Sequence, residues 1–151
     1  MSKQVWKPGT LLAPAPAALV TCGTAENPNV LTVAWTGIIN SVPPMTYVSI
    51  RPERWSHHII EENMEFCINV TTAELTRAAD FCGVRSGKDK GKFAEMKLTP
   101  VAASAEKAPI IDQSTVSLEC KVKEIKRLGR HDKLHAVIVA GDLSFKPLPL
   151  P

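Results

Sequence analysis

Six short β-favouring segments, separated by turns that contain Gly, Pro or Asn, limit the fold of this chain more than any other feature. They cover residues 17–24, 29–35, 45–50, 65–70, 116–122 and 134–143. Short strands divided by such turns are typical of antiparallel sandwiches and barrels. The chain has 151 residues, enough for one substantial core and too few for two domains of ordinary size. We therefore expect one mainly β domain over residues 1–151, folded as a closed or partly closed antiparallel barrel.

The polarity of these segments refines the expectation. AENP, at residues 25–28, suits a hairpin loop between the first two segments. VSLECKV, at 116–122, alternates apolar and polar residues, as a strand with one face in water does. LHAVIVAGDL, at 134–143, is almost continuously apolar, so we expect it to be buried on both faces.

Two short helices are expected between the strands, with a further helical turn at KFAEM. The first covers SHHIIEEN, with Ser56 as its candidate N-cap. The second follows Thr71 and Glu74, which have the spacing of a capping box. Apolar residues then recur at helical intervals, and Gly83 can end the helix.

Charge and cysteine spacing exclude several classes of protein. Lys and Arg number 18 against 15 Asp and Glu, a net charge of +3, and the basic residues are spread along the chain. Double-stranded nucleic acid usually demands a concentrated basic surface, whereas a small acidic ligand is compatible with this charge. The four cysteines lie far apart, so they form neither a local zinc knuckle nor a C-x-x-C redox pair, and we predict no metal.

The apolar stretch TLLAPAPAALV near the N-terminus is not expected to be a signal peptide. Pro14 and Pro16 interrupt it, and a strand pattern follows. No segment is apolar over the length that a membrane span needs. We therefore expect a cytoplasmic protein without membrane association.

SIRPERWS, at residues 49–56, concentrates hydrogen-bond donors where a strand leads into a helix. Free backbone N–H groups and the helix dipole favour an anion at a helix N-terminus. Arg51, Arg54 and the Ser56 hydroxyl would add donors suited to a phosphate group. The alternative is a capped helix with two solvated arginines, and spacing alone favours it.

DFCGVRSGKDKGKF, at residues 80–93, is a second place where glycines and basic side chains coincide. It lacks the GxxxxGK[ST] order of a P-loop. Considered alone, it is better interpreted as a solvated lysine loop.

In combination and in this order, the motifs resemble the flavin reductase-like, FMN-binding split-barrel proteins, particularly the flavoredoxin branch. The similarity depends on NVLTVAW followed by TGI, on SIRPERWS, on DFCGVRSGKDKGKF, on LTP, and on GRH before the last strand. It runs from about Thr10 to Asp142. The resemblance implies a six-stranded antiparallel split barrel of Greek-key topology with short flanking helices. It also implies a homodimer, bound FMN, and hydride transfer from NADH or NADPH to the flavin.

The resemblance also assigns residues of this chain to the cofactor. The flavin ring would be lined, largely through backbone, by Thr32, Val33, Ala34, Trp35 and Thr36. The ribityl phosphate end would be held by Ser49, Arg51, Arg54 and Ser56, with His57 nearby. The cofactor would be covered by Cys82, Gly83, Ser86, Gly87 and Lys90. The catalytic position beside the flavin and nicotinamide would be that of His131.

Three of these residues also have an ordinary structural interpretation. Cys82 ends an apolar helix stripe, where a lone cysteine more often packs than reacts. Trp35 is expected either to shield the ring or to sit in the core. His131 is otherwise a loop histidine, and its spacing of four from His135 does not define a metal site where a loop enters a strand.

The leading functional interpretation is an FMN-dependent oxidoreductase that uses NAD(P)H. One alternative is a flavoredoxin-type electron carrier served by a redox partner protein. The other, less favoured, is a small barrel for single-stranded nucleic acid, because such sites stack bases on aromatics and this chain has one Tyr, four Phe and three Trp. No motif selects NADPH over NADH. At the C-terminus, SFKPLPLP is expected to be extended, where members of the flavoredoxin branch have a segment that packs on the partner.

Overall fold

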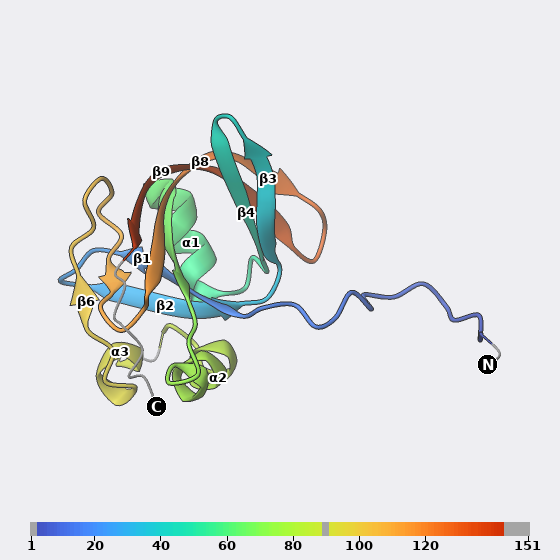
Figure 1. Cartoon of the computed structure of the whole chain (residues 1–151), viewed down its shortest axis with the longest axis horizontal. Coiled ribbons are helices and arrows are strands. Elements are labelled where there is room, and N and C mark those ends of the chain that lie inside the picture. Colours follow the sequence, from blue (N-terminus) through green and yellow to red (C-terminus); the bar gives the residue numbers. More distant parts are fainter. Residues whose placement is uncertain (1–2, 89–90, 144–151) are drawn as a thin grey trace, which may run out of the picture.

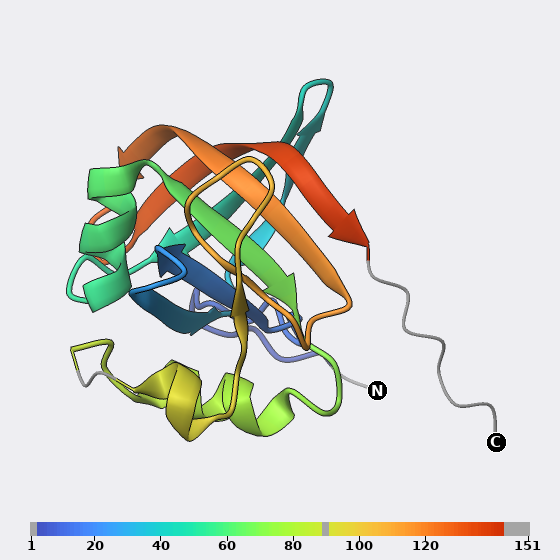
Figure 2. The same ribbon diagram turned by 90° about the vertical axis from the view of Figure 1, so that its left-hand side faces the viewer.

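The computed structural model describes residues 3–88 and 91–143, so Lys90 and the proline-rich end lie outside the described residues. The elements are β1 (Ala18–Gly23), β2 (Pro28–Val33), β3 (Thr36–Ser41), β4 (Pro44–Ile50), α1 (Trp55–Asn63), β5 (Glu65–Val70), α2 (Thr76–Val84), α3 (Lys92–Glu95), β6 (Pro100–Val101), β7 (Ile110–Ile111), β8 (Val116–Arg127) and β9 (Asp132–Leu143). Figure 1 shows the strands curving around a common interior. In Figure 2, α2 and α3 lie together on one side of this barrel and α1 lies at one end of it.

One antiparallel sheet contains seven of the described strands, in the order β2-β1-β5-β8-β9-β4-β3, and β6 pairs with β7 separately. The β1–β2 hairpin turns at residues 24–27, where Thr24 N donates to Asn27 O at 3.4 Å and Asn27 N to Thr24 O at 3.2 Å. The mainly β, antiparallel class and the expected AENP loop are therefore confirmed. Each of the six predicted segments corresponds to a strand of the main sheet.

Strand β3 was not predicted, and its side chains explain why. They are only half-buried or exposed along its whole length, so the segment shows no buried alternating face. Pairing with β4 organises it instead, in a register that places Thr36 opposite Val48. The Thr46 hydroxyl also donates to the Gly37 carbonyl at 3.0 Å. A strand formed by its neighbour in this way leaves little trace in the hydrophobic pattern.

The expectation that β9 is buried on both faces is wrong. Leu134 and Ala136 are buried, whereas His135 and Val137 are half-buried and Val139 is 42% exposed. One face therefore packs into the barrel and the other partly contacts water, as is usual for an antiparallel sheet. The apolar side chains on the outer face made the sequence look uniformly buried.

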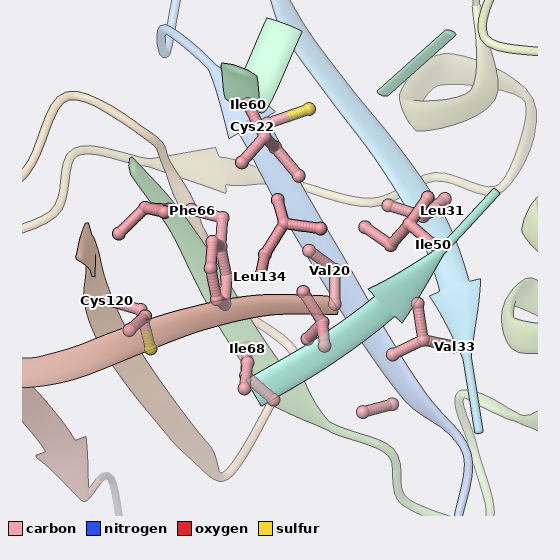
Figure 3. Packing of buried hydrophobic residues seen from close by; sticks show 14 residues of the cluster. Val20, Cys22, Leu31, Val33, Ile50, Ile60, Phe66, Ile68, Cys120 and Leu134 are labelled. Atoms are coloured by element: carbon pink, nitrogen blue, oxygen red, sulfur yellow. The ribbon is translucent and has the colours of Figure 1, made fainter. Parts of the chain in front are cut away.

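The barrel interior is a packed hydrophobic core. Figure 3 shows Val20, Leu31, Ile50, Phe66 and Leu134 projecting toward one another from five different strands. Phe66 is fully buried. Because side chains fill this interior, a ligand site has to lie at an edge or an end of the barrel.

Both helix starts differ from the sequence predictions. The N-cap of α1 is Arg54, in extended backbone and without a side-chain cap, so Ser56 is not the N-cap. The Ser56 hydroxyl instead accepts a hydrogen bond from Asn29 Nδ2 at 2.8 Å. The capping box is also wrong, because α2 begins only at Thr76 and the Thr71 hydroxyl donates to the Ala17 carbonyl at 2.7 Å. In each case the hydroxyl forms a hydrogen bond with a residue distant in sequence instead of capping the helix.

An N-terminal arm, residues 3–16, projects from the barrel (Figure 1), and every residue in it is exposed. It carries large apolar side chains with high exposed fractions: Val5 101%, Trp6 69%, Leu11 64% and Leu12 96%. In the described part of the chain, no helix has the length and apolar character needed to cross a membrane.

Two buried carboxylates hold the loop at residues 104–108. Glu119 accepts hydrogen bonds from the backbone N–H groups of residues 104–106, at 2.6 to 3.1 Å. Glu65 accepts from the N–H groups of residues 107 and 108, at 2.9 and 3.0 Å. Partial burial, together with a hydrogen bond to Glu65 and its charge, raises the pKa of Glu106 in this loop from 4.5 to about 7.

The raised pKa predicts a pH-dependent stability. Between these two pKa values the folded chain binds more protons than the unfolded chain, so this contribution to the free energy of unfolding is complete below the lower value and is lost as pH rises through the higher one. We expect Glu106→Gln to flatten the dependence in urea unfolding between about pH 5 and about pH 8. The exposed Glu74→Gln variant serves as the control. An unchanged pH dependence in Glu106→Gln would contradict the assignment.

Candidate functional site

Two adjacent cavities lie where β4 leads into α1. The arginine cavity has a volume of about 470 Å³ and is lined by Leu31, Arg51, Glu53, Arg54, Trp55, Ser56, Val84, Arg85, Ser86, Gly87 and Lys92. The His131 cavity has a volume of about 180 Å³ and is lined by Leu31, Thr32, Val33, Ala34, Trp35, Ser49, Ile50, Arg51, Arg54 and His131. Both contain Leu31, Arg51 and Arg54, so the two cavities adjoin.

The start of α1 forms one wall of the arginine cavity. The extended backbone of Arg54 turns the chain out of β4, and its carbonyl accepts from His57 N at 2.9 Å in the first turn of the helix. Arg54 Nη2 donates to the Gly83 carbonyl at 2.7 Å, which ties this wall to α2. The Ser56 hydroxyl accepts a hydrogen bond from Asn29, which ties the start of the helix to β2.

The opposite wall is the loop after α2, which approaches the first wall closely at Gly87. A Cβ atom built there would lie 2.7 Å from Asn29 Oδ1 and 3.0 Å from Trp55 Cδ1. Glycine therefore allows this loop to close against Trp55 without displacing Asn29. Ser86, next to it, lines the same cavity.

Cations dominate the lining of the arginine cavity. Arg51, Arg54, Arg85 and Lys92 contribute to it, with Glu53 as the carboxylate. Guanidinium groups beside a helix N-terminus are suited to a phosphate or another small oxyanion. This arrangement favours the anion-binding interpretation of SIRPERWS over that of solvated arginines.

Lys92 is a lining residue that the sequence analysis treated only as part of a lysine loop. Its side chain is buried, with Nζ donating to the Val30 carbonyl at 2.8 Å and the Cys82 carbonyl at 3.2 Å. The interpretation as a solvated lysine is therefore wrong at this position. Trp55, which lies between two predicted residues in sequence, was also missed. Tertiary packing decides which lysine of the loop is buried, and the local sequence pattern does not show this.

The His131 cavity is a narrower slot with an aromatic edge. The rings of Trp35 and His131 lie with their centroids 4.4 Å apart and their planes at 36°. Trp35 is 45% exposed, so its interpretation as a core residue is wrong. His131 enters from the short β8–β9 connection at residues 128–131. Apolar Val33 and Ile50 line the slot as well.

Four of the described residues assigned by resemblance are not among those lining either cavity. Thr36 opens β3, and its hydroxyl donates to the Tyr47 carbonyl at 2.6 Å. Gly83 contributes a carbonyl to Arg54. His57 is buried, with Nε2 2.9 Å from Asp132 Oδ2. Lys90 lies outside the described residues.

Cys82 is also absent from both linings. Its side chain is fully buried in an apolar cluster that includes Leu19, Val30 and Phe93. This burial raises the pKa of the thiol, so the protonated form is favoured. The packing role that the sequence analysis preferred for Cys82 agrees with this position.

The described residues contain no group of three or more His, Cys, Asp or Glu side chains placed to hold a metal ion. His135, which follows His131 by four residues, faces Glu124 instead, with Nδ1 3.3 Å from Oε2. The two histidines therefore lie in different surroundings, although they are only four residues apart in sequence.

The cation-lined arginine cavity thus adjoins the smaller His131 cavity, which Trp35 and His131 line. Residues 11–148 match the family described as flavin reductase like domain. The chain belongs to this flavin reductase-like family, and the resemblance seen in the motifs is confirmed.

Individual relatives agree with this family. An uncharacterised protein of Pyrococcus abyssi is 32% identical over 121 residues, which cover 80% of this chain and 69% of the relative. An FMN reductase (NADH), RutF, of Stutzerimonas stutzeri is 24% identical over 102 residues, covering 68% of this chain and 56% of the relative. The structure of flavoredoxin from Desulfovibrio vulgaris (Miyazaki F) superposes with a TM-score of 0.86 at 29% identity, covering 94% of this chain and 76% of that protein. The predicted split-barrel fold class is thus confirmed.

Proposed function

We propose that this protein binds FMN and acts as an oxidoreductase that takes a hydride from NADH or NADPH. The observation that carries the proposal is the junction of the two cavities at Arg51 and Arg54. An elongated ligand with an anionic end and a planar end fits this junction, since one cavity is cationic and the other is a slot. The relative called FMN reductase (NADH) supports NADH as the donor.

The residues present match the demands of FMN. We assign the phosphate to the arginine cavity, held by Arg51, Arg54, Ser56, Ser86 and Gly87. We assign the ring to the His131 cavity, lined by Thr32, Val33, Ala34 and Trp35. Ser49, which was expected at the phosphate end, lines this cavity and not the arginine cavity. Leu31, Val33 and Ile50 exclude water from the inner side of this slot.

Bound FMN would supply the electron-accepting ring of the reaction. The chain itself supplies position and electrostatics, because hydride transfer requires two flat rings in alignment. We assign to His131, which lines the slot beside Trp35, the role of orienting the nicotinamide. The cationic side chains hold the phosphate end and thereby fix the register of the ring.

The absorbance spectrum of the purified protein, with mass identification of any small molecule released on denaturation, tests cofactor binding. Titration of FMN into protein stripped of ligand gives the affinity. Anaerobic mixing of the FMN-loaded protein with NADH or NADPH then tests hydride transfer through bleaching of the flavin. Absence of FMN binding would overturn the proposal.

The similarity to flavoredoxin favours one second candidate, an electron carrier served by a partner protein. The two functions differ in the bleaching experiment. A carrier binds FMN but remains oxidised in NADH and NADPH, while a reductase bleaches with at least one of them.

We also propose that the protein is one FMN-binding domain that forms a homodimer, and the exposed apolar residues of the arm support a dimer. Light scattering at micromolar concentration is expected to report a dimer. Aspartate at both Leu11 and Leu12 should weaken dimerisation at least about tenfold, because burying one leucine side chain contributes about 1.5 to 3 kcal/mol. The matched control places aspartate at Gln4 and Thr10 of the same arm. A monomeric wild-type protein with FMN bound would overturn this prediction.

A further inference from the structure

Four polar side chains form a ring, the His57 tetrad, which consists of His57, Glu61, Arg127 and Asp132. His57 Nε2 is 2.9 Å from Asp132 Oδ2, and Arg127 Nη1 contacts the same carboxylate oxygen. Arg127 Nη2 also contacts Glu61, whose Oε2 lies 3.7 Å from His57 Nδ1. His57 is 2% exposed and Asp132 1%, so the central pair is removed from water.

Two residues of the tetrad are chain neighbours of residues that line the two cavities. His57 directly follows Ser56, which lines the arginine cavity, and Asp132 directly follows His131, which lines the other. Arg127 ends β8 and Asp132 begins β9, so the tetrad holds both ends of the connection at residues 128–131. Within this connection, Leu128 N donates to the His131 carbonyl at 3.2 Å.

We propose that His57 is a positioning residue that sets the place of the His131 ring against Trp35 and couples that place to the start of α1. His57 acts through Asp132. The positional part of this inference stands without a ligand. Its effect on rate rests on the proposed function.

The energetics of burial explain why His57 controls this position. A buried carboxylate is costly unless hydrogen-bonded donors surround it, and here the donors are His57 and Arg127. Removal of the His57 donor leaves Asp132 underpaired, so its backbone is expected to shift toward water. His131 is the adjacent residue and shifts with it. In a reaction that depends on aligned rings, such a displacement lowers the rate.

Nuclear magnetic resonance of the ligand-free protein tests the positional part. The chain has four histidines, and the ring C–H signal of His131 is assigned by its loss in His131→Ala. The ring current of Trp35 displaces the chemical shift of this signal, and the Trp35→Leu variant gives its chemical shift without that displacement. We expect His57→Leu to lose most of the displacement and His57→Gln to keep it, because a glutamine amide can donate to Asp132 in place of Nε2.

A second pair of variants covers the outcome in which His57→Leu does not fold. Arg127→Met removes the other donor to Asp132, and its side chain is 58% exposed, which favours a folded variant. Lys126→Met is its control, since Lys126 is the exposed neighbour in the same strand. We expect the His131 signal to move in Arg127→Met and to stay in Lys126→Met. If the His131 signal in folded His57→Leu keeps its wild-type position, the inference is overturned. If His57→Leu does not fold, a wild-type position of this signal in Arg127→Met overturns it.

The rate provides an independent measure in the FMN-loaded protein. His57→Leu is expected to slow flavin reduction about tenfold and to leave the rate of a His131→Ala protein unchanged, because the effect passes through His131. An equal slowing in both backgrounds overturns the coupling. If wild-type protein is not reduced by NAD(P)H, the proposed function fails while the resonance experiment still decides the position of His131.

Discussion

Replacing Arg54 by alanine is expected to weaken FMN binding by about tenfold to a hundredfold. Arg54 lines both cavities and lies at the N-terminus of α1, where its charge adds to the positive potential of the helix dipole. A charge-assisted hydrogen bond contributes about 1.5 to 3 kcal/mol, and each 1.4 kcal/mol changes an affinity tenfold. Fluorescence titration of FMN into the ligand-free variant measures the change.

Riboflavin separates loss of the phosphate contact from general damage to the site. Wild-type protein is expected to bind FMN at least about tenfold more tightly than riboflavin, and Arg54→Ala should reduce this preference. Arg77→Ala is the matched control, because Arg77 is an exposed residue of α2 away from both cavities. Arg54 also binds the Gly83 carbonyl, so thermal unfolding has to show that the variant remains folded. If wild-type protein bound FMN and riboflavin equally tightly, the assignment of the phosphate to the arginine cavity would be wrong.

Replacing His131 by alanine is expected to slow flavin reduction by NAD(P)H by about tenfold to a hundredfold while flavin content stays nearly unchanged. The imidazole lines the slot against Trp35 and is not among the residues lining the arginine cavity, so we assign it to orienting the nicotinamide and not to retaining FMN. Stopped-flow bleaching of the FMN-loaded variant measures the rate, and the absorbance of released flavin measures the content.

His58→Ala is the matched control for this substitution. His58 is an exposed histidine of α1 that pairs with Glu62, with Nε2 3.3 Å from Oε1. Its removal should leave the rate of reduction unchanged. A wild-type rate in His131→Ala would dismiss His131 from the catalytic site, whereas loss of flavin from that variant would assign it to cofactor retention.

Local pattern was sufficient for the strands that pack on the core. Residues 65–70, for example, were predicted as a strand with the bounds that the structure has for β5, because five of its six side chains are buried. The same logic failed for β3, whose side chains face water, and for the outer face of β9. The hydrophobic pattern records burial, so a strand defined by its neighbours and not by burial escapes it.

The candidate site divides in a similar way. Arg51, Arg54 and Ser56 were proposed as phosphate donors from SIRPERWS, whereas Ser86 and Gly87 were assigned through the family resemblance, and all five line one cavity in the structure. SIRPERWS was informative because anion binding requires donors, which leave a local record of Arg and Ser. Lys92 was missed as a buried residue, since its partners Val30 and Cys82 come from other elements.

The sequence by itself determined the class of barrel, the order of six of the strands and the stretches that carry the donors, because each depends on residues near one another in the chain. Only the tertiary structure decided which members of those stretches share a cavity and which turn away. His57 was placed near the phosphate by the family resemblance, yet its partner Asp132 lies 75 positions further along the chain. A buried polar side chain must find a partner wherever the fold brings one, and that requirement is met in space, not in sequence.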